Sequence, residues 1–489
     1  MRNLKIIPIS LCAAGMLALT GCASESGAEP SAGSTSAGDC WVSFEIAPAA
    51  AAAGQTSGSR AEESAGSATD KTINECRIND LVALLVDSDD DTVRGIAQGR
   101  DVVIASAGQL HKVTVNMGNL SMYEKEHKYR LYVFANLPGG YTDLSYAYGR
   151  TIEEVGKMVA GSLRALSSRD FEGSDGLPMS TLTDEAGKIQ VSLKKETSYT
   201  SEKPYLVVQD PDMTQAGTLI LTPLCARLDF VENAVNKAYT YPIGHAGEGN
   251  AANVVDVKVK LTHAMVRNAG SDVYLMPQGS ASQFNLATPS TSVFGNSASF
   301  SVKSGAVAYV PEYVPTVSGD RLSYNALTYM QLDGCLVADA QCTGMDASVR
   351  KAITEAATKK STSPKLYYFD DGLIQSQLTT IPHPGEANWH ELAYDATVGG
   401  YKVSYRHGIR HDAGQGKNLE DGKVFPMEYA IVRNYLYQIE VQSIGALPHP
   451  NGGETDNVEN TSEDISIRIA PPAKWSYHRG GTTVEFNKD

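Results

Sequence analysis

Cys22 is the residue whose chemistry the sequence indicates most clearly. It is the last residue of Leu19-Thr20-Gly21-Cys22, at the end of an apolar run. The basic residues Arg2 and Lys5 open that run. An ordinary secretory signal ends instead in an A-x-A-like site. The pattern is typical of a bacterial lipoprotein signal, in which the cysteine thiol receives a diacylglyceryl lipid. We therefore predict a signal peptide over residues 1–21 and lipidation of Cys22; the alternative is a plain signal peptide with a chance cysteine.

Catalytic signatures are missing from the sequence: it contains no G-x-S-x-G, H-E-x-x-H, P-loop or Rossmann glycine pattern. Asp87, Asp89 and Asp91 alternate like calcium-loop ligands, but Thr92 stands where such a loop requires glycine and Gln98 where it requires glutamate. A solvated turn is the better interpretation. We expect no catalytic residue, metal or cofactor, and at this point the residues give no support for an enzyme.

Beyond Cys12 in the signal and the lipid site, five cysteines remain, at irregular spacing: Cys40, Cys76, Cys225, Cys335 and Cys342. None forms a C-x-x-C pair, so a zinc ribbon or a thioredoxin-like site is not expected. Cys335 and Cys342 are close enough in sequence to close a hairpin disulfide after export. Buried free thiols are the alternative for the others.

Composition narrows the class of protein. The 489 residues carry a formal net charge of −15, which argues against nucleic-acid binding, since such proteins concentrate Lys and Arg. Hydrophobic residues make up 42% of the chain, enough to build cores. After the signal, no apolar run approaches the roughly 18 residues that a membrane helix needs. We expect attachment to a membrane through the lipid alone.

A single strand is predicted near the front, where Val42, Phe44 and Ile46 alternate with polar residues. Tracts rich in Ala, Ser and Gly flank it over residues 23–39 and 49–70, and the second tract contains Arg60-Ala61. Strands of one domain are normally joined by short turns. This one therefore stands apart from the rest of the chain.

Strand patterns dominate the remainder and favour a mainly β fold with two β-sandwich domains and a few helical insertions. Helices are predicted over residues 151–167, from an apolar stripe, and over residues 347–358, with Asp346 as N-cap. A polar stretch over residues 278–299 is the candidate boundary. Strands are predicted over residues 80–87, 129–135, 205–209, 218–221, 254–262, 306–310, 327–332, 366–369, 401–405 and 431–444, followed by a terminal pair around Ile465, Ile467 and Ile469 and around Val484 and Phe486.

Three motifs in this order resemble the fimbrillin family of Bacteroidales, the type V pilins, and most of all the stalk subunit of the short (minor) fimbriae of Porphyromonas. The first is the lipobox, the lone strand and Arg60-Ala61. The second is Asp70-Lys71 and then Ile78-Asn79-Asp80-Leu81 running into an apolar strand. The third begins at Arg433-Asn434-x-x-Tyr437 and leads to an acidic loop and a final strand pair with Trp475. One departure is that Ala473-Lys474 separates the prolines from Trp475, which leaves the register of the terminal strands open.

The resemblance implies transthyretin-like or Greek-key sandwiches and export to the outer membrane and cell surface. An arginine-specific protease would cut between Arg60 and Ala61, removing residues 22–60 with the strand of Val42, Phe44 and Ile46. The mature chain would then comprise residues 61–280 and 281–489 as two domains. Strands within 462–489 would fill the vacated groove of another copy or of an accessory subunit, and the expected donor residues are Ile465, Ile467, Ile469, Trp475, Val484 and Phe486.

The resemblance thus predicts a non-enzymatic stalk subunit of an extracellular fimbria that supports adhesion. Two alternatives stay open at this point. One is a tip or accessory adhesin of the same fold, which needs no donor strand. The other is a monomeric surface lipoprotein that binds or cleaves glycans and keeps its lipid.

Overall fold

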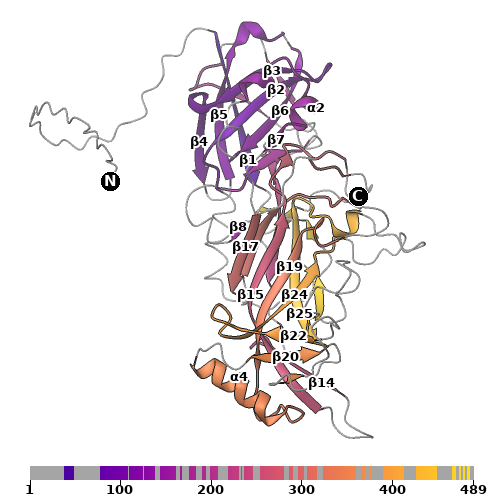
Figure 1. Cartoon of the computed structure of the whole chain (residues 1–489). Helices are drawn as coiled ribbons and strands as arrows, with labels where there is room; N and C mark the ends of the chain where they lie inside the picture. The colour runs from indigo at the N-terminus through magenta and orange to yellow at the C-terminus, as the bar shows by residue number, and fades with distance from the viewer. Residues whose placement is uncertain are drawn as a thin grey trace, which may run out of the picture. The chain divides into compact units, whose positions relative to one another are not determined.

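A computed structural model describes residues 38–48, most of 77–448 with short internal gaps, and the segments 465–469, 473–474, 477–479 and 482–484. The chain divides into residues 1–37, which lie outside the described range, and the compact unit of residues 38–489. Within the described part, no helix combines the length and the apolarity needed to span a membrane. The predicted mainly β fold is confirmed (Figure 1).

The first sandwich is built from one ten-stranded sheet, in the order β3-β2-β6-β9-β12-β1-β5-β4, with β10 added to β6 and β11 added to β1. Most of its strands alternate or run apolar, as a buried sheet requires. In chain order they are β1 (Asp39–Pro48), β2 (Leu81–Asp87), β3 (Val93–Gln98), β4 (Val102–Ala107), β5 (Leu110–Asn119), β6 (Lys128–Ala135), β9 (Met179–Thr181), β10 (Gln190–Ser192), β11 (Tyr205–Leu206) and β12 (Thr218–Pro223), with 3₁₀ helices η1 (Gly99–Asp101), η2 (Leu120–Met122) and η3 (Ser145–Ala147) between them.

The second sandwich pairs two six-stranded sheets around one apolar core. The first of these sheets contains β8 (Leu166–Ser167), β13 (Cys225–Phe230), β18 (Ala306–Pro311), β25 (Tyr435–Ile444), β26 (Ile465–Ile469) and β27 (Ala473–Lys474). The other contains β14 (Thr240–His245), β15 (Val254–Ala269), β17 (Asn296–Ser301), β19 (Tyr329–Val337), β23 (Tyr394–Asp395) and β24 (Gly400–Gly408). Smaller elements are β7 (Val159–Ala160) with β16 (Val273–Tyr274), β21 (Ile374–Gln375), β20 (Leu366–Phe369) and β22 (Trp389–Leu392), η4 (Pro426–Tyr429), and β28 (Tyr477–Arg479) with β29 (Thr482–Val484).

Helix α4 (Ala347–Lys359) confirms the second predicted helix. Asp346 accepts hydrogen bonds from the backbone N–H of Ser348 at 2.7 Å and of Val349 at 3.4 Å, which is the capping role expected of it. The apolar side chains Val349 and Ile353 lie in the core of the second sandwich. The helix is therefore held by its cap and by one buried face.

The first predicted helix is much shorter than expected, because α2 covers only Ile152–Gly156. It begins with a capping box, in which Thr151 and Glu154 exchange side-chain and backbone hydrogen bonds. Beyond it, the Gly156 carbonyl accepts from the N–H of Met276 at 3.1 Å, and the Met158 carbonyl accepts from Leu275 at 2.9 Å. The helix ends here because the segment at β16 takes the carbonyls that another turn would use.

The predicted domain boundary at 280/281 does not coincide with the change of sheet. Sheet membership switches between β12 and β13, around residue 224, so β13, β14 and β15 already belong to the second sandwich. Residues 273–276 then return to pack with Leu224 and the strands β2 and β6 in a satellite cluster of the first sandwich. Because the chain crosses between the sandwiches more than once, a single polar stretch could not reveal the division.

Candidate functional site

The candidate site is the place that β1 occupies inside the first sheet, between β5 on one side and β11 and β12 on the other (Figure 1). We call this place the seat of β1. On one side β1 pairs antiparallel with β5, with Val42 opposite Val115 and Ile46 opposite His111. On the other side it pairs in parallel, first with β11 and then with β12. The predicted strand is confirmed, and both of its edges are hydrogen-bonded.

The inward face of β1 fills the core of the first sandwich. Cys40, Val42 and Ile46 are completely buried, and Phe44 is 3% exposed. All four belong to one apolar cluster with residues of β2, β5, β6 and β12. Burying each large side chain is worth roughly 1.5–3 kcal/mol. The strand is therefore a major part of this core.

The outward face of β1 carries one well-satisfied hydroxyl. Ser43 is buried, its Oγ donates to the Val113 carbonyl at 3.1 Å, and it accepts from Thr114 Oγ1 at 3.2 Å. Two positions on, Glu45 lies opposite Lys112 in the β5 register, and Thr218 Oγ1 donates to its carboxylate at 3.5 Å. Sequence reasoning missed Ser43, although a serine inside an apolar strand is a signal for a paired hydroxyl.

Trp41 sits at the outer edge of this seat. Its backbone N–H donates to the Tyr199 carbonyl at 3.1 Å, but its indole Nε1 is buried with no hydrogen-bond partner among the described residues. A buried unsatisfied N–H costs about 1–3 kcal/mol. This end of β1 is thus less well satisfied than the middle.

The predicted tail residues are only partly placed. β26 contains Ile465, Ile467 and Ile469 and pairs antiparallel with β25 of its own chain, at the edge of the second sandwich. Val484 ends β29, which pairs with β28. The other predicted site residues, Cys22, Arg60, Ala61, Trp475 and Phe486, lie outside the described residues.

The third sequence motif forms a buried junction. Arg433 is 4% exposed and Glu312 is 1% exposed; Arg433 Nη2 lies 2.7 Å from Glu312 Oε2. Arg433 also donates from Nη2 to the Tyr274 carbonyl at 2.8 Å and from Nη1 to that of Leu275 at 3.4 Å. It therefore joins β25 and β18 to the chain segment that packs on the first sandwich. No sequence signal identified Glu312 as its partner.

Two further positions of that motif, Asn434 and Tyr437, are structural as well. Asn434 has φ +61°, a left-handed conformation that Asn tolerates better than most residues, and its N–H donates to the Cys225 carbonyl at 3.0 Å. The Tyr437 hydroxyl is fully buried, accepts from Val432 N–H at 3.1 Å and is hydrogen-bonded to His411 at 2.8 Å. The motif thus specifies the entry into β25.

The second motif is held by one side chain. Asn136 donates to the carbonyls of Arg77 at 2.7 Å and Leu177 at 3.0 Å, and its Oδ1 accepts from Asn79 N–H at 2.8 Å. This clamp fixes the chain just before β2 begins. The motif around Ile78 therefore reflects the anchoring of the first residues after the predicted cleavage segment.

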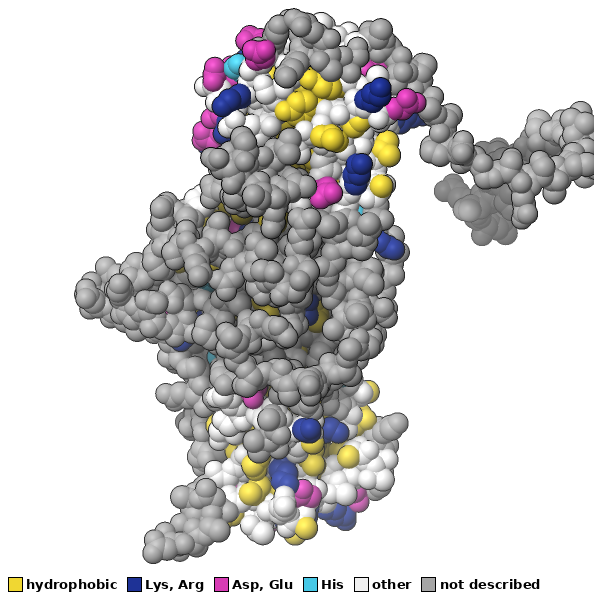
Figure 2. Space-filling view, turned by 180° about the vertical axis from the view of Figure 1, so that it is seen from behind, with side chains coloured by type: hydrophobic (Ala, Val, Ile, Leu, Met, Phe, Trp, Pro, Cys, Tyr) yellow, Lys and Arg dark blue, Asp and Glu magenta, His cyan; other side chains and the backbone are white. Residues whose placement is uncertain are grey.

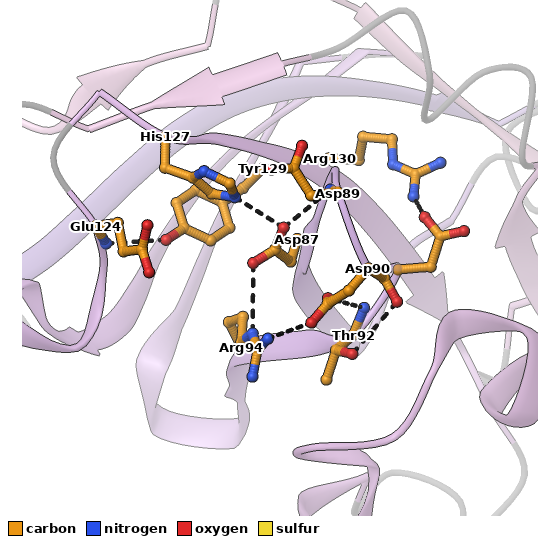
Figure 3. Close-up of polar contacts among 10 residues, drawn as sticks. Asp87, Asp89, Asp90, Thr92, Arg94, Glu124, His127, Tyr129 and Arg130 are labelled. Atoms are coloured by element: carbon orange, nitrogen blue, oxygen red, sulfur yellow. Dashed lines mark hydrogen bonds and ion pairs between the residues drawn. The ribbon is translucent and has the colours of Figure 1, made fainter.

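The aspartates after β2 form an ion-pair network (Figure 3). Asp87 Oδ1 lies 2.7 Å from His127 Nε2 and accepts from Asp89 N–H at 2.9 Å, while Arg94 Nε lies 3.5 Å from Oδ2. Asp87, Asp89 and His127 offer ligand atoms within 4.8 Å of one another, but Asp87 already has these partners, and Asp91 pairs instead with Arg130. The network orders the turn between β2 and β3.

This network predicts a pH-dependent contribution to stability. Partial burial alone would raise the pKa of Asp87, but the Asp89 N–H and His127 outweigh it and lower that pKa; the hydrogen bond to Asp87 raises the pKa of His127. The contribution is therefore lost as pH falls through the Asp87 pKa and as pH rises through the His127 pKa. His127→Gln should melt about 1 °C below the wild type near pH 5.5. Melting curves at pH 5.5 and pH 9 test this, and an unchanged difference at pH 9 would contradict it.

The disulfide predicted between Cys335 and Cys342 is not formed: both are buried free thiols. Cys335 lies in β19 against β24, so close to Gly400 that a Cβ there would meet its Sγ at 3.3 Å. Cys342 Sγ is instead 3.6 Å from Asp339 Oδ1. The two side chains are engaged with different neighbours. Cys40 and Cys225 are free and buried as well.

Exposed large apolar side chains are few among the described residues: Val103, Met122, Tyr146, Tyr148 and Leu206. All belong to the first sandwich or its connections. Figure 2 shows hydrophobic side chains there among acidic and basic ones. Leu206, in β11, lies beside β1, and it is 62% exposed.

Comparison with known proteins gives structural likeness only. No family model matches the sequence, and no curated protein matches it significantly. The tip fimbrial protein Mfa3 of Porphyromonas gingivalis, truncated at its C-terminus, is similar with a TM-score of 0.40 and 12% identity, over 89% of this chain and 100% of that one. Two Parabacteroides distasonis proteins assigned to cell adhesion give TM-scores of 0.43 and 0.45 at 14% and 11% identity, over 89% and 90% of this chain and 96% and 100% of theirs.

These neighbours are fimbrial and cell adhesion proteins of Bacteroidales, the group whose fimbrillins the sequence resembles. Their TM-scores lie below 0.5, so the likeness is too loose to transfer a function to this chain. A functional proposal has to rest on the seat of β1 and on the sequence.

Proposed function

We propose that this chain is a structural, non-enzymatic subunit of a cell-surface fimbria, exported as a lipoprotein and polymerised by strand exchange after cleavage at Arg60. One observation carries the proposal. The strand that fills the middle of the first sheet, β1, lies ahead of Arg60-Ala61 in the chain, while the other described strands of that sheet lie after it. One cut there makes a core strand separable.

The physical consequence of losing β1 supports the proposal. Its departure would expose the backbone N–H and C=O groups of β5 on one side and of β11 and β12 on the other. It would also open the apolar core behind Val42, Phe44 and Ile46. Unpaired strand edges are templates for another strand, and β-augmentation fills them with both hydrogen bonds and side-chain pockets. A strand from a second copy makes a heterologous contact, which builds an open filament.

The proposed setting follows from the lipobox. The lipid at Cys22 would hold the uncleaved chain at the outer membrane, and removal of residues 22–60 would release it into the extracellular fimbria. The proposed partners are further copies of the chain, accessory fimbrial subunits and an arginine-specific protease. We propose no role for nucleic acid or for a cofactor.

Sequencing the N-terminus of protein extracted from the cell surface tests the proposal. A mature start at Ala61 in the polymeric fraction is expected. A lipid-modified Cys22 as the only mature start would contradict it and favour a monomeric surface lipoprotein. Arg60→Ala is the matched variant, and it should leave the lipidated, monomeric chain.

Deleting every residue after Asn460 should give a folded subunit that does not polymerise. The deletion removes β26, which pairs with β25 at a sheet edge, and keeps every residue of the core clusters in the described part of both sandwiches. Circular dichroism with a cooperative melt checks folding, and high-mass ladders in gels of unheated samples report polymers. Ladders from the truncated chain would show that the tail is not the donor.

A further inference from the structure

β26 and the residues after it repeat the sequence of β1. Residues 42–48 read Val-Ser-Phe-Glu-Ile-Ala-Pro, and residues 465–471 read Ile-Ser-Ile-Arg-Ile-Ala-Pro. The serine, the isoleucine at the fifth position, the alanine and the proline are identical, and the first and third positions are apolar in both. Two segments more than 400 residues apart therefore carry one pattern of side chains.

The positions that match are the ones that the seat of β1 constrains most. Phe44 and Ile46 enter the core, and Ala47, on the opposite face of the strand, is completely buried as well. Ser43 is buried with its hydroxyl hydrogen-bonded to β5, so an apolar residue there would leave Thr114 with a lost partner. The tail segment offers a hydroxyl at this position and apolar groups at the others. Its chemistry fits the seat in one register.

The present place of β26 is weaker than the seat of β1. Among the described strands it lies at the edge of its sheet and pairs on one side only, with β25, and that ladder is interrupted between Val441 and Ser443. The seat of β1 offers a partner strand on each side. A strand that moves from the edge to this seat therefore gains a second set of backbone hydrogen bonds.

We propose that β26 of a second copy takes the seat of β1, in the direction and register of β1, with Ser466 in the place of Ser43. This deepens the proposed function, on which it rests, by naming the donor segment and its alignment. The rival segment, Thr482–Phe486, would also supply a hydroxyl and a carboxylate, at the places of Ser43 and Glu45. It differs in the buried positions, because Thr482 would replace Val42 and Val484 would replace Phe44, although Phe486 would replace Ile46. It would also place the polar Asn487 where Ala47 is completely buried, whereas the segment at β26 keeps an alanine there.

The register also sets where the donor strand begins. Continuing the alignment upstream would put Glu463 in the place of Cys40, which is completely buried. Burying an unpaired carboxylate at this position would cost too much free energy. The donor strand therefore enters the sheet at Ile465 and leaves the position of Cys40 to other groups.

Arg468 is the one position where the charges of the two strands differ. In its own chain it lies opposite Glu440, whereas in the proposed register it lies opposite Lys112, where β1 carries Glu45. The arginine thus favours the intramolecular place of β26 and opposes exchange. Arg468 therefore shifts the balance toward the position of β26 against β25 of its own chain.

Cysteine pairs test the register in the full-length chain, processed by its own cells, with Cys76→Ser in every variant. Thr114→Cys lies opposite Ser43 in β5, so it is combined in turn with Ser466→Cys, with Arg468→Cys and with Thr483→Cys. The second pair reports a slip by two residues and the third reports the rival strand. Mild oxidation followed by non-reducing, denaturing gels shows which pair links one subunit to the next.

We expect covalent ladders from the Ser466→Cys pair and none from the other two. Ladders from either of the others, or polymers that no pair cross-links, would overturn the register and leave the proposed function standing. Subunits that never assemble, cross-linked or not, would overturn both. The uncleaved Arg60→Ala chain with the Ser466→Cys pair is the control and should stay monomeric.

The charge of Arg468 gives an independent test. Arg468→Glu should speed assembly of cleaved subunits about threefold. The new carboxylate repels Glu440 where β26 pairs with β25 of its own chain, and in the proposed register it lies opposite Lys112, as Glu45 does in β1. Arg468→Gln should fall between the two. Adding Lys112→Glu to the first variant should reverse the gain; equal rates for all four chains would contradict the proposed alignment.

Discussion

Replacing Phe44 by Ala is expected to lower the free energy of unfolding of the uncleaved protein by about 3–5 kcal/mol. The side chain is 3% exposed and lies in the core cluster of the first sandwich, so its removal leaves a cavity. The proposed function further predicts that Phe44→Ala leaves the heat stability of assembled fibres unchanged, because cleavage removes β1 before assembly. Urea unfolding of the uncleaved chain and heat dissociation of purified fibres measure the two effects.

Val113→Ala is the matched control for this prediction. Val113 is completely buried, lies opposite Phe44 in the register and belongs to β5, which stays in the mature subunit. It should cost about 1.5–3 kcal/mol in the uncleaved chain and weaken the fibres too. If Phe44→Ala weakened purified fibres as much as Val113→Ala does, β1 would still be seated in the assembled subunits, and strand exchange would be wrong.

The fold could be predicted from the sequence wherever one side-chain period decides the element. β2, β18 and β20 were predicted to within about a residue, because alternation or a short apolar run has no helical interpretation at that length. β1 was predicted in the right place but is longer than its alternating residues at both ends. The helix predicted over residues 151–167 failed for the opposite reason. Its apolar stripe is real, but the carbonyls of Gly156 and Met158 are taken by residues 275–276, a competition between distant segments that local periodicity cannot show.

For the candidate site, too, local sequence predicted the strand but not the partners that lie far away in the chain. The sequence predicted that β1 is a strand with Val42, Phe44 and Ile46 on one face, and this is confirmed. The strand is not isolated in the fold, because it pairs with neighbours on both sides. The sequence could not predict that β5 and β12 flank β1, since strand pairing depends on contacts between residues far apart in the chain. Glu312 was missed because a single glutamate after a strand looks like any solvated acid until its buried arginine is known.

Glu312→Gln is expected to destabilise the protein by about 3–5 kcal/mol, because it leaves the Arg433 guanidinium buried without its counter-charge. The carboxylate takes hydrogen bonds from Nε at 2.9 Å and from Nη2 at 2.7 Å of that arginine, and from its backbone N–H at 3.2 Å. Arg433→Lys should lose nearly as much, since one ammonium cannot reach Glu312 and the carbonyls of residues 274 and 275 together. Urea unfolding monitored by tyrosine fluorescence gives both values.

The exposed pair Lys365–Glu391 supplies the control for charge removal as such. The nitrogen and oxygen of this pair lie 2.9 Å apart, but both side chains are solvated, so Glu391→Gln should leave the unfolding midpoint almost unchanged.

The buried pair of Arg433 and Glu312 also predicts how the two sandwiches unfold. Because Arg433 ties β25 to residues 274–275, which lead into the satellite cluster of the first sandwich, loss of Glu312 should split unfolding into two transitions. A single transition at the wild-type midpoint would mean that the buried pair does not couple the sandwiches.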